Sequence, residues 1–326
     1  MLKMLLLAYL ALVLTLLPAC LPRVGNTPGV TAAAERAEPY SADMPIPVAA
    51  ESVLLQLPHG GVCEMDMQEY LVGVVAAEMP ASFEPQALRA QAVAARTYAL
   101  YCTSAHKHGT AGVCTDPGCC QAYADDAQLR ANWGAAYETN LSRIRKAVEA
   151  TDGEYLSYGG APVFAAFHSS SAGATEDCGE VWNARPYLIS VSSPETAEQV
   201  PNYQSTVRIW RLDFRDTLLA AHPECDFSGS EEGWVGETER DASGRVSAVT
   251  IGGVRIPGTE LRRLFALRST AFTLSVSGGL FTFSVTGFGH GVGMSQYGAN
   301  TLAASGWDYR AILAHYYPGT ALVGTV

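Results

Sequence analysis

A short amphipathic helix is predicted over Met67–Met79, and it constrains the fold because its apolar stripe has to face a core. Asp66 and Glu69 resemble a capping box at its start, and Pro80 ends it. Positions i, i+3, i+4 and i+7 share one face of a helix. The residues with this spacing are Leu71, Val74, Val75 and Glu78. An acidic residue therefore stands where an aliphatic side chain is expected.

Glu78 is a candidate general acid. A carboxyl group on an apolar stripe loses hydration, which disfavours its charged form and raises its pKa. A carboxylic acid that stays protonated near neutral pH is able to donate a proton to a leaving group. The alternative is a glutamate at the end of the helix that turns to solvent or pairs with an arginine.

A second helix is predicted over Pro85–Cys102, which begins with proline and is rich in alanine, leucine, glutamine and arginine. Val93, Arg96, Thr97 and Leu100 share one of its faces. Arg96 has two compatible interpretations. It is a buried partner of Glu78 that stabilises the fold, or a cation that binds substrate or tunes the acid.

The N-terminus predicts export. Lys3 precedes an apolar run, Met4–Leu17, which is shorter than the roughly 20 residues of a membrane span and suits the core of a signal peptide. Residues 1–22 are interpreted as a cleaved signal peptide, an uncleaved membrane anchor or, through Cys20, a lipidated N-terminus. All three place the following chain outside the cytoplasm. Residues 23–50, rich in proline and alanine, predict a flexible tether.

Residues 51–326 predict an α+β fold, in which a helical front part with the candidate acid packs on a strand-rich remainder. They form one catalytic region, or two subdomains with a boundary near residue 150. Helices are expected at 67–79, 85–102, 129–151, 207–222, 258–264, 296–305 and 309–315. Strands are expected at 52–57, 154–158, 161–168, 188–192 and within 234–285. Loops are expected at 106–123, 169–182 and 287–293.

The charge balance limits the class of partner. The chain has 32 acidic and 21 basic residues and a net charge of −11. Binding to nucleic-acid phosphates requires a basic face, so nucleic acid is not expected to be the main partner.

Three of the eight cysteines lie within seven residues, a clustering more typical of a metal site than of a disulfide framework. His108, Cys114 and Cys120 are spaced six and six, and two thiolates with an imidazole suit Zn²⁺. Cys119 and His106 are spare candidate ligands. The alternative is one or two disulfides, such as Cys102–Cys114 or Cys114–Cys120.

Two loops of small residues carry histidine and serine, Phe167–Gly173 and Gly289–Gln296. Neither has the G-x-S-x-G form of a nucleophile elbow, so a serine hydrolase is not favoured. Small residues allow the backbone to approach a ligand closely. The candidate substrate-binding residues are His168, Ser169, Ser170, His290, Ser295, Gln296 and Tyr297. For His290 the alternative is a structural histidine in a tight turn.

Several long motifs, in order, resemble the stage II sporulation protein D family. They are Glu69–Pro80, with Ala-Glu-Met-Pro at its end; Ala87–Ala99, with Ala-Arg-Thr-Tyr; Val181–Trp182; Arg185–Leu188; Gly289–Ala299; and His315–Thr320. The resemblance extends from about Ser52 to about Leu322.

The resemblance implies a peptidoglycan lytic transglycosylase that acts in sporulation and engulfment. Such an enzyme cleaves denuded glycan strands between N-acetylmuramic acid and N-acetylglucosamine and leaves 1,6-anhydro ends. Glu78 would be its single general acid and base, and Arg96 a residue important for activity. His108, Cys114 and Cys120 would hold a structural zinc ion, as in some clostridial members. No organic cofactor is expected.

The same resemblance implies partners and a location. The partners are peptidoglycan glycan strands, a cell-wall amidase and a membrane scaffold of the engulfment machinery. The chain is expected to be exported, tethered to a membrane and facing the cell wall or intermembrane space of a sporulating cell. Two alternatives remain: a non-catalytic amidase enhancer that binds the cell wall, and a zinc hydrolase with an open catalytic site.

Overall fold

The computed structural model describes residues 51–57 and 60–324. The described residues belong to one compact unit. The predicted signal or anchor and the whole of the predicted tether, residues 1–50, lie outside the described residues. Within 51–57 and 60–324, no helix is both long and apolar enough to cross a membrane.

The described chain contains both helices and strands, which confirms the predicted α+β class. The helices are α2 (Met67–Glu78), α3 (Pro85–Ser104), α4 (Asp126–Trp133), η1 (Gly134–Ala136), α5 (Tyr137–Glu149), α6 (Cys178–Val181), α7 (Arg211–Ala221), η2 (Glu231–Gly233), α8 (Gly258–Leu264), α9 (Gln296–Ala304) and α10 (Tyr309–Tyr316). The strands are β1 (Ser52–Gln56), β2 (Val62–Asp66), β3 (Val113–Cys114), β4 (Tyr155–Tyr158), β5 (Ala161–Pro162), β6 (Phe167–His168), β7 (Gln204–Trp210), β8 (Val235–Arg240), β9 (Val246–Ile251), β10 (Val254–Pro257), β11 (Phe272–Ser277), β12 (Leu280–Thr286), β13 (Met294–Ser295) and β14 (Ala321–Val323).

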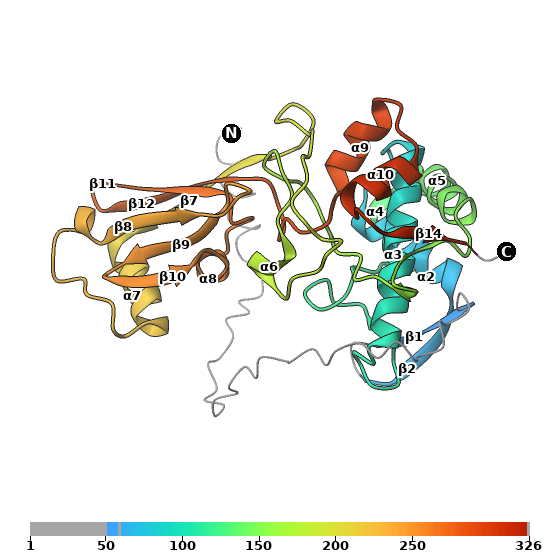
Figure 1. Cartoon of the computed structure of the whole chain (residues 1–326), viewed down its shortest axis with the longest axis horizontal. Coiled ribbons are helices and arrows are strands. Elements are labelled where there is room, and N and C mark those ends of the chain that lie inside the picture. The colour runs from blue at the N-terminus through green and yellow to red at the C-terminus, as the bar shows by residue number, and fades with distance from the viewer. Residues whose placement is uncertain (1–50, 58–59, 325–326) are drawn as a thin grey trace, which may run out of the picture. The chain divides into compact units, whose positions relative to one another are not determined.

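The front helices form for local reasons that the sequence displays. The Asp66 side chain caps α2 by accepting a 3.0 Å hydrogen bond from the Glu69 N–H. Pro85 occupies the first turn of α3, where its missing N–H costs nothing. Helix α3 is almost entirely buried and is contacted by α2, α5, α9 and α10 (Figure 1). One hydrophobic core forms around it and also includes residues that follow β4 and β13.

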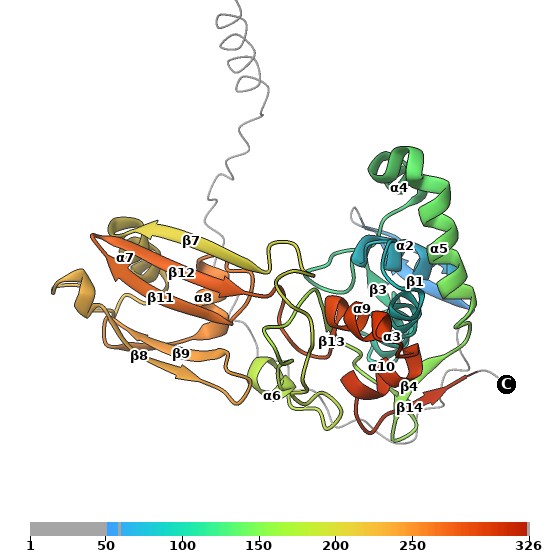
Figure 2. The same ribbon diagram turned by 90° about the horizontal axis from the view of Figure 1, so that it is seen from above.

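A second hydrophobic core lies within residues 207–285. Strands β7, β12 and β11 form one antiparallel sheet and β8, β9 and β10 form another (Figure 2). Helices α7 and α8 supply apolar side chains to the same core. Phe214 of α7 stacks on Phe281 of β12 with ring centroids 3.9 Å apart. The strand-rich part of the chain therefore has a core of its own.

Short strands bring distant segments to the front helices. Strand β13 pairs in parallel with β6, so that Met294 lies opposite Phe167 and Ser295 opposite His168. The two glycine-containing loops are therefore neighbours. Strand β14 pairs with β4, and the remaining small sheet has the order β2-β1-β3.

Several predicted boundaries are wrong. The helix predicted over 207–222 is strand β7 followed by α7, because Val207 and Ile209 alternate with polar residues until Trp210. The strand predicted over 188–192 does not form, and Ser192 makes only an isolated bridge. The strand predicted over 161–168 is broken into β5 and β6, and the predicted loop 169–182 contains α6. A subdomain boundary near residue 150 stays a prediction.

Candidate active site and metal centre

Glu78 is the last residue of α2 and is partly buried. Its Oε1 accepts a 2.7 Å hydrogen bond from the Ala122 N–H, and its Oε2 accepts a 3.4 Å bond from Gln296 Nε2. Burial raises the pKa of the carboxyl group, and the two hydrogen bonds oppose that rise. Within the described chain, Glu78 forms no ion pair and no second carboxylate influences its pKa. The setting therefore favours the protonated form of the Glu78 carboxyl group more than water does.

The donor Ala122 belongs to an irregular segment, residues 119–124, which we call the strap. The Gln121 amide donates to the Tyr70 hydroxyl at 3.1 Å and to the Ala95 carbonyl at 3.3 Å. The Tyr123 ring stacks on Tyr70 at 5.9 Å between centroids. The Ala124 N–H donates to the Gly73 carbonyl at 3.2 Å. The strap is therefore bonded along its length to α2 and α3.

Gly73 is the point at which α2 and the strap come closest. A Cβ at this position would lie 2.4 Å from a Tyr123 ring carbon and 2.9 Å from the Ala124 carbonyl oxygen. No real Cβ atom tolerates such contacts, so a glycine is required for the strap to lie on the helix.

Arg96 is 2% exposed, and its guanidinium contacts groups other than Glu78. Its Nη1 donates to the Thr151 carbonyl at 2.6 Å and to the Glu154 carbonyl at 3.1 Å, and Nη2 lies 3.7 Å from Asp152 Oδ1. The predicted pairing with Glu78 is wrong: the arginine stabilises the turn between α5 and β4. A role of Arg96 in activity stays a prediction.

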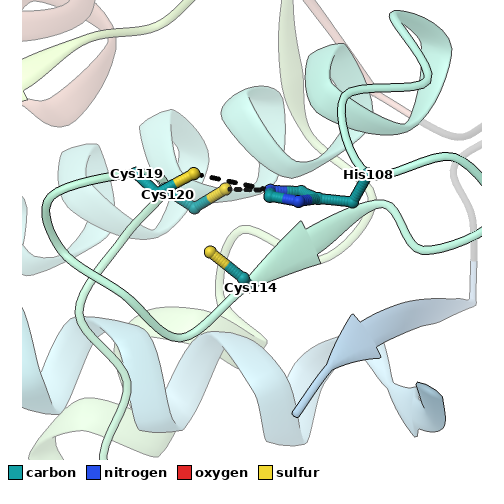
Figure 3. Close-up of side chains that lie close together, drawn as sticks. All are labelled: His108, Cys114, Cys119 and Cys120. Carbon is teal, nitrogen blue, oxygen red and sulfur yellow. Dashed lines mark hydrogen bonds between the residues drawn. The ribbon is translucent and has the colours of Figure 1, made fainter. Parts of the chain in front are cut away.

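Four potential metal ligands converge at the start of the strap. The ligand atoms of His108, Cys114, Cys119 and Cys120 all lie within 4.8 Å of one another. His108 Nε2 is 3.1 Å from Cys120 Sγ and 3.7 Å from Cys119 Sγ, and the four side chains point toward a common centre (Figure 3). An imidazole with thiolates at this spacing is a donor set that Zn²⁺ prefers.

The disulfide alternative is contradicted by the structure. All seven cysteines that lie in the described part of the chain are free, including Cys102, Cys114 and Cys120. The predicted triad is brought together, and Cys119, a spare candidate from the sequence, joins it.

Most of the predicted substrate-binding hydroxyl and imidazole groups face inward. The His168 ring is buried, with Nε2 2.7 Å from Ser171 Oγ and Nδ1 3.2 Å from the Val292 carbonyl. Burial lowers the pKa of His168 well below its usual value, so the ring is neutral at physiological pH. Ser170 is also buried, and the Ser169 carbonyl accepts a 3.0 Å bond from the Tyr297 N–H.

Buried Glu195 organises this interior network. Its Oε1 accepts from the Ser171 N–H at 2.6 Å and from the Ser295 hydroxyl, and its Oε2 accepts from the Ser193 hydroxyl at 2.6 Å. Ser193 is in turn 2.9 Å from the Tyr316 hydroxyl. A buried carboxylate requires such partners, and here they bind the two loops to α10.

Of the other three candidates from these segments, Gln296 is buried, whereas Tyr297 and His290 are half-buried. Gln296, which begins α9, reaches Glu78, and Tyr297 packs edge-on against Phe83 at 4.9 Å between centroids. His290 lies 4.8 Å from the ring of Trp182, whose side chain is 44% exposed. Desolvation, with Arg262 nearby, lowers the pKa of His290 to about 3, so it is a neutral hydrogen-bonding group rather than a cation.

The chain is similar in sequence to known proteins over most of its length. A family model described as Stage II sporulation protein matches residues 59–158. Stage II sporulation protein D of Bacillus amyloliquefaciens is 36% identical over 287 residues, which cover 87% of this chain and 80% of that protein. The chain belongs to the stage II sporulation protein D family. Stage II sporulation protein D of Bacillus subtilis (strain 168) is 38% identical over 260 residues, 78% of this chain and 74% of that protein.

An Amidase enhancer of Bacillus subtilis (strain 168) is also similar, at 32% identity over 300 residues. The match covers 77% of this chain but 40% of that longer protein. This member of the stage II sporulation protein D family therefore has relatives with two different names.

Two parts of the candidate site were not predicted. Ala122 acts through its backbone N–H, which has no side-chain signature, and only the fold brings it to Glu78. Glu195 lies in a polar segment without periodicity, so nothing in the sequence distinguishes it from a surface carboxylate.

Proposed function

We propose that the protein is a peptidoglycan lytic transglycosylase, with Glu78 as its only catalytic acid and base. The observation that carries the proposal is the environment of Glu78: partly buried, raised in pKa and without a neighbouring carboxylate in the described chain. Glycoside hydrolysis ordinarily uses two carboxyl groups, the second to activate water or to attack the sugar. A single acid is sufficient if the substrate supplies the nucleophile.

N-acetylmuramic acid supplies such a nucleophile in its 6-hydroxyl group. In the first step Glu78 donates its proton to the glycosidic oxygen as the bond from the anomeric carbon to that oxygen breaks. N-acetylglucosamine then leaves with a free 4-hydroxyl. The 2-acetamido group helps to stabilise the oxocarbenium-like centre.

In the second step the 6-oxygen bonds to the anomeric carbon, and the Glu78 carboxylate takes the hydroxyl proton. The acid is regenerated, a 1,6-anhydro ring closes and no water is consumed. Because both reacting groups belong to one sugar, the attack is intramolecular and gains the entropic advantage of such reactions.

The hydrogen bonds of Glu78 support different roles for its two carboxyl oxygens. The Ala122 N–H can only donate, so Oε1 serves as the acceptor at 2.7 Å. Oε2, with the longer 3.4 Å contact to Gln296, is left to carry the mobile proton. Substrate would then lie on the Oε2 side of the carboxyl group.

The exposed ring of Trp182 beside His290 supports a sugar-binding surface. Its indole also packs edge-on against Phe164 at 5.5 Å, which fixes the orientation of the ring. A fixed aromatic face binds the apolar face of a sugar, and the neutral imidazole is suited to hydrogen-bond a hydroxyl or acetamido group. The buried His168, Ser170 and Ser295 would support this surface from beneath.

We also propose a structural zinc ion bound by the His108, Cys114 and Cys120 side chains. When bound, zinc would join the loop that precedes the strap to Cys120 at the start of the strap. No step of the reaction involves it, and no organic cofactor is required.

The proposed biological setting is sporulation. The chain would be exported and tethered to a membrane, and it would face the cell wall or intermembrane space of a sporulating cell. A cell-wall amidase would remove stem peptides and leave the denuded glycan that the enzyme cleaves, and a membrane scaffold of the engulfment machinery would hold the two together.

The second candidate function is a non-catalytic enhancer of an amidase, which the similarity to an Amidase enhancer favours. Digestion of amidase-treated peptidoglycan by the wild type and by Glu78→Gln separates the two. The proposal predicts soluble glycan fragments from the wild type and none from the variant. Stimulation of an amidase by both proteins, without glycan cleavage by either, would establish the enhancer.

A further inference from the structure

We propose that Cys119 is a fourth zinc ligand, and that the resulting closed site fixes the strap which presents the Ala122 N–H to Glu78. A site of one histidine and two cysteines leaves a coordination position open, as catalytic zinc sites do. A site of one histidine and three cysteines is closed and structural. The assignment of Cys119 therefore decides what the metal does.

The geometry supports a fourth ligand. The Cys119 Sγ lies within the same 4.8 Å cluster as the other three ligand atoms and is 3.7 Å from His108 Nε2. That separation is close to the distance between two ligands of one tetrahedral zinc ion, which is roughly 3.4–3.8 Å for bonds of about 2.0–2.3 Å. Figure 3 shows the Cys119 and Cys120 sulfurs on the same side of the imidazole, with Cys114 facing both.

The local charge also fits three thiolates. Three thiolates, a neutral imidazole and Zn²⁺ leave one negative charge. The Lys107 ammonium donates to the Cys119 carbonyl and, at 3.1 Å, to the Tyr98 hydroxyl, so a cation is held beside the cluster. The Tyr98 hydroxyl itself donates to the same carbonyl at 3.2 Å.

The link to the acid is short. Cys120 is followed by Gln121 and then by Ala122, whose N–H donates to Glu78 Oε1. Cys119 and Cys120 would fix one end of the strap on the metal, and the Ala124–Gly73 bond fixes the other on α2. Ala122 thus lies between two anchors. Cys119 and Cys120 are therefore positioning residues. Their effect on catalysis rests on the proposed function of Glu78.

Cobalt substitution counts the thiolates. The full chain is loaded with Co²⁺, whose visible bands report tetrahedral geometry and whose near-ultraviolet charge-transfer band grows with each thiolate ligand. Cys119→Ser is expected to lose about one third of the charge-transfer intensity and to bind Zn²⁺ about tenfold more weakly than the wild type. Cys119→His keeps a fourth ligand and should retain tetrahedral bands. Cys63→Ala, which removes a partly buried thiol outside the cluster, is the control.

An unchanged cobalt spectrum and Zn²⁺ affinity in Cys119→Ser would overturn the fourth ligand. If Cys119→Ser does not fold, the wild-type spectrum alone still decides. A spectrum with two thiolates, or with a five-coordinate ion, contradicts the proposal.

Hydrogen exchange tests the coupling. The full chain is compared with and without a zinc chelator, and exchange is read in the strap and, as a control, in strand β9. Metal removal is expected to raise exchange in residues 119–124, Ala122 included, by roughly tenfold or more and to leave β9 unchanged. Equal changes in both segments, or no change in the strap, would overturn the coupling.

These readouts do not depend on glycan cleavage. A three-thiolate cobalt spectrum with a zinc-dependent strap, in a protein that does not cleave glycan, refutes only the proposed function. Glycan cleavage that requires Glu78, with a strap insensitive to zinc, refutes only the coupling.

Discussion

The backbone N–H of Ala122 lies 2.7 Å from Glu78 Oε1 and binds the carboxyl group at the end of α2. The bond joins two segments that are 44 residues apart in the chain. It lowers the pKa of Glu78 against the larger, opposite effect of burial. Burial and this hydrogen bond therefore shift the pKa of Glu78 in opposite directions, and the effect of burial is the larger.

Glu78→Gln is expected to stabilise the protein in a pH-dependent way. A carboxyl group whose pKa is raised on folding contributes its full stability below its ordinary pKa of 4.5 and loses it as the pH rises through the raised value. Glutamine carries no charge, so the variant should gain stability relative to the wild type as the pH rises from below 4.5 to 8. Chemical denaturation at several pH values measures this gain, and a constant difference across the range would contradict the raised pKa.

Arg96→Lys is expected to reduce stability by about 2–3 kcal/mol, because a buried guanidinium that donates to two carbonyl groups is lost. Arg89→Lys on the same helix is the matched control, since Arg89 is partly exposed and no side-chain hydrogen bond holds it within the described chain. Denaturant unfolding compares the two.

The same variants test whether Arg96 acts in the reaction. If its role is structural, Arg96→Lys should keep kcat within about threefold of the wild type at a temperature where the variant is folded. A large loss of kcat in a fully folded variant would show instead that Arg96 takes part in the reaction.

Gly73→Ala is expected to destabilise the protein by about 1–3 kcal/mol through its collision with Tyr123 and Ala124. Helix propensity predicts the opposite sign, since alanine is favoured over glycine by about 1 kcal/mol inside a helix. Ala77 is an exposed residue of α2, so Ala77→Gly measures the effect of helix propensity alone. This variant should lose about 1 kcal/mol of stability. Stabilisation by Gly73→Ala, measured by thermal unfolding, would show that the strap does not rest on α2.

Trp182→Ala is expected to lower kcat/KM for glycan about tenfold or more, because an exposed ring held beside His290 is removed from the proposed sugar surface. The change should be mainly in KM if the ring binds substrate and transition state equally. Trp210→Ala, at a 62% exposed tryptophan of β7, is the control and should leave the kinetics unchanged. Equal effects of both substitutions would argue against a specific role for Trp182.

The parts of the fold that sequence could predict are those decided by neighbouring residues. The cap at Asp66 and the proline at position 85 define α2 and α3 because capping and helix initiation act within one turn. The spacing of His108, Cys114 and Cys120 was sufficient to propose a metal site, because the segments between these residues contain glycine and can fold back around an ion.

The remaining features depend on contacts between distant segments. Arg96 on an apolar stripe gave no indication of whether it meets a carboxylate or backbone carbonyls, and its partners come from the turn after α5. Ala122 is an ordinary alanine in the sequence and becomes part of the site only because the strap crosses the end of α2. The alternation of β7 was hidden because it runs without a break into the helical pattern of α7.

Cleavage of amidase-treated peptidoglycan in water enriched in oxygen-18 tests the central claim most directly. If Glu78 transfers the proton and the muramic acid 6-hydroxyl is the nucleophile, the new ends are one water lighter than hydrolysed ends, carry no heavy oxygen and are absent with Glu78→Gln. Products that incorporate oxygen-18 at the new reducing end, or undiminished cleavage by Glu78→Gln, would contradict a single-acid transglycosylase.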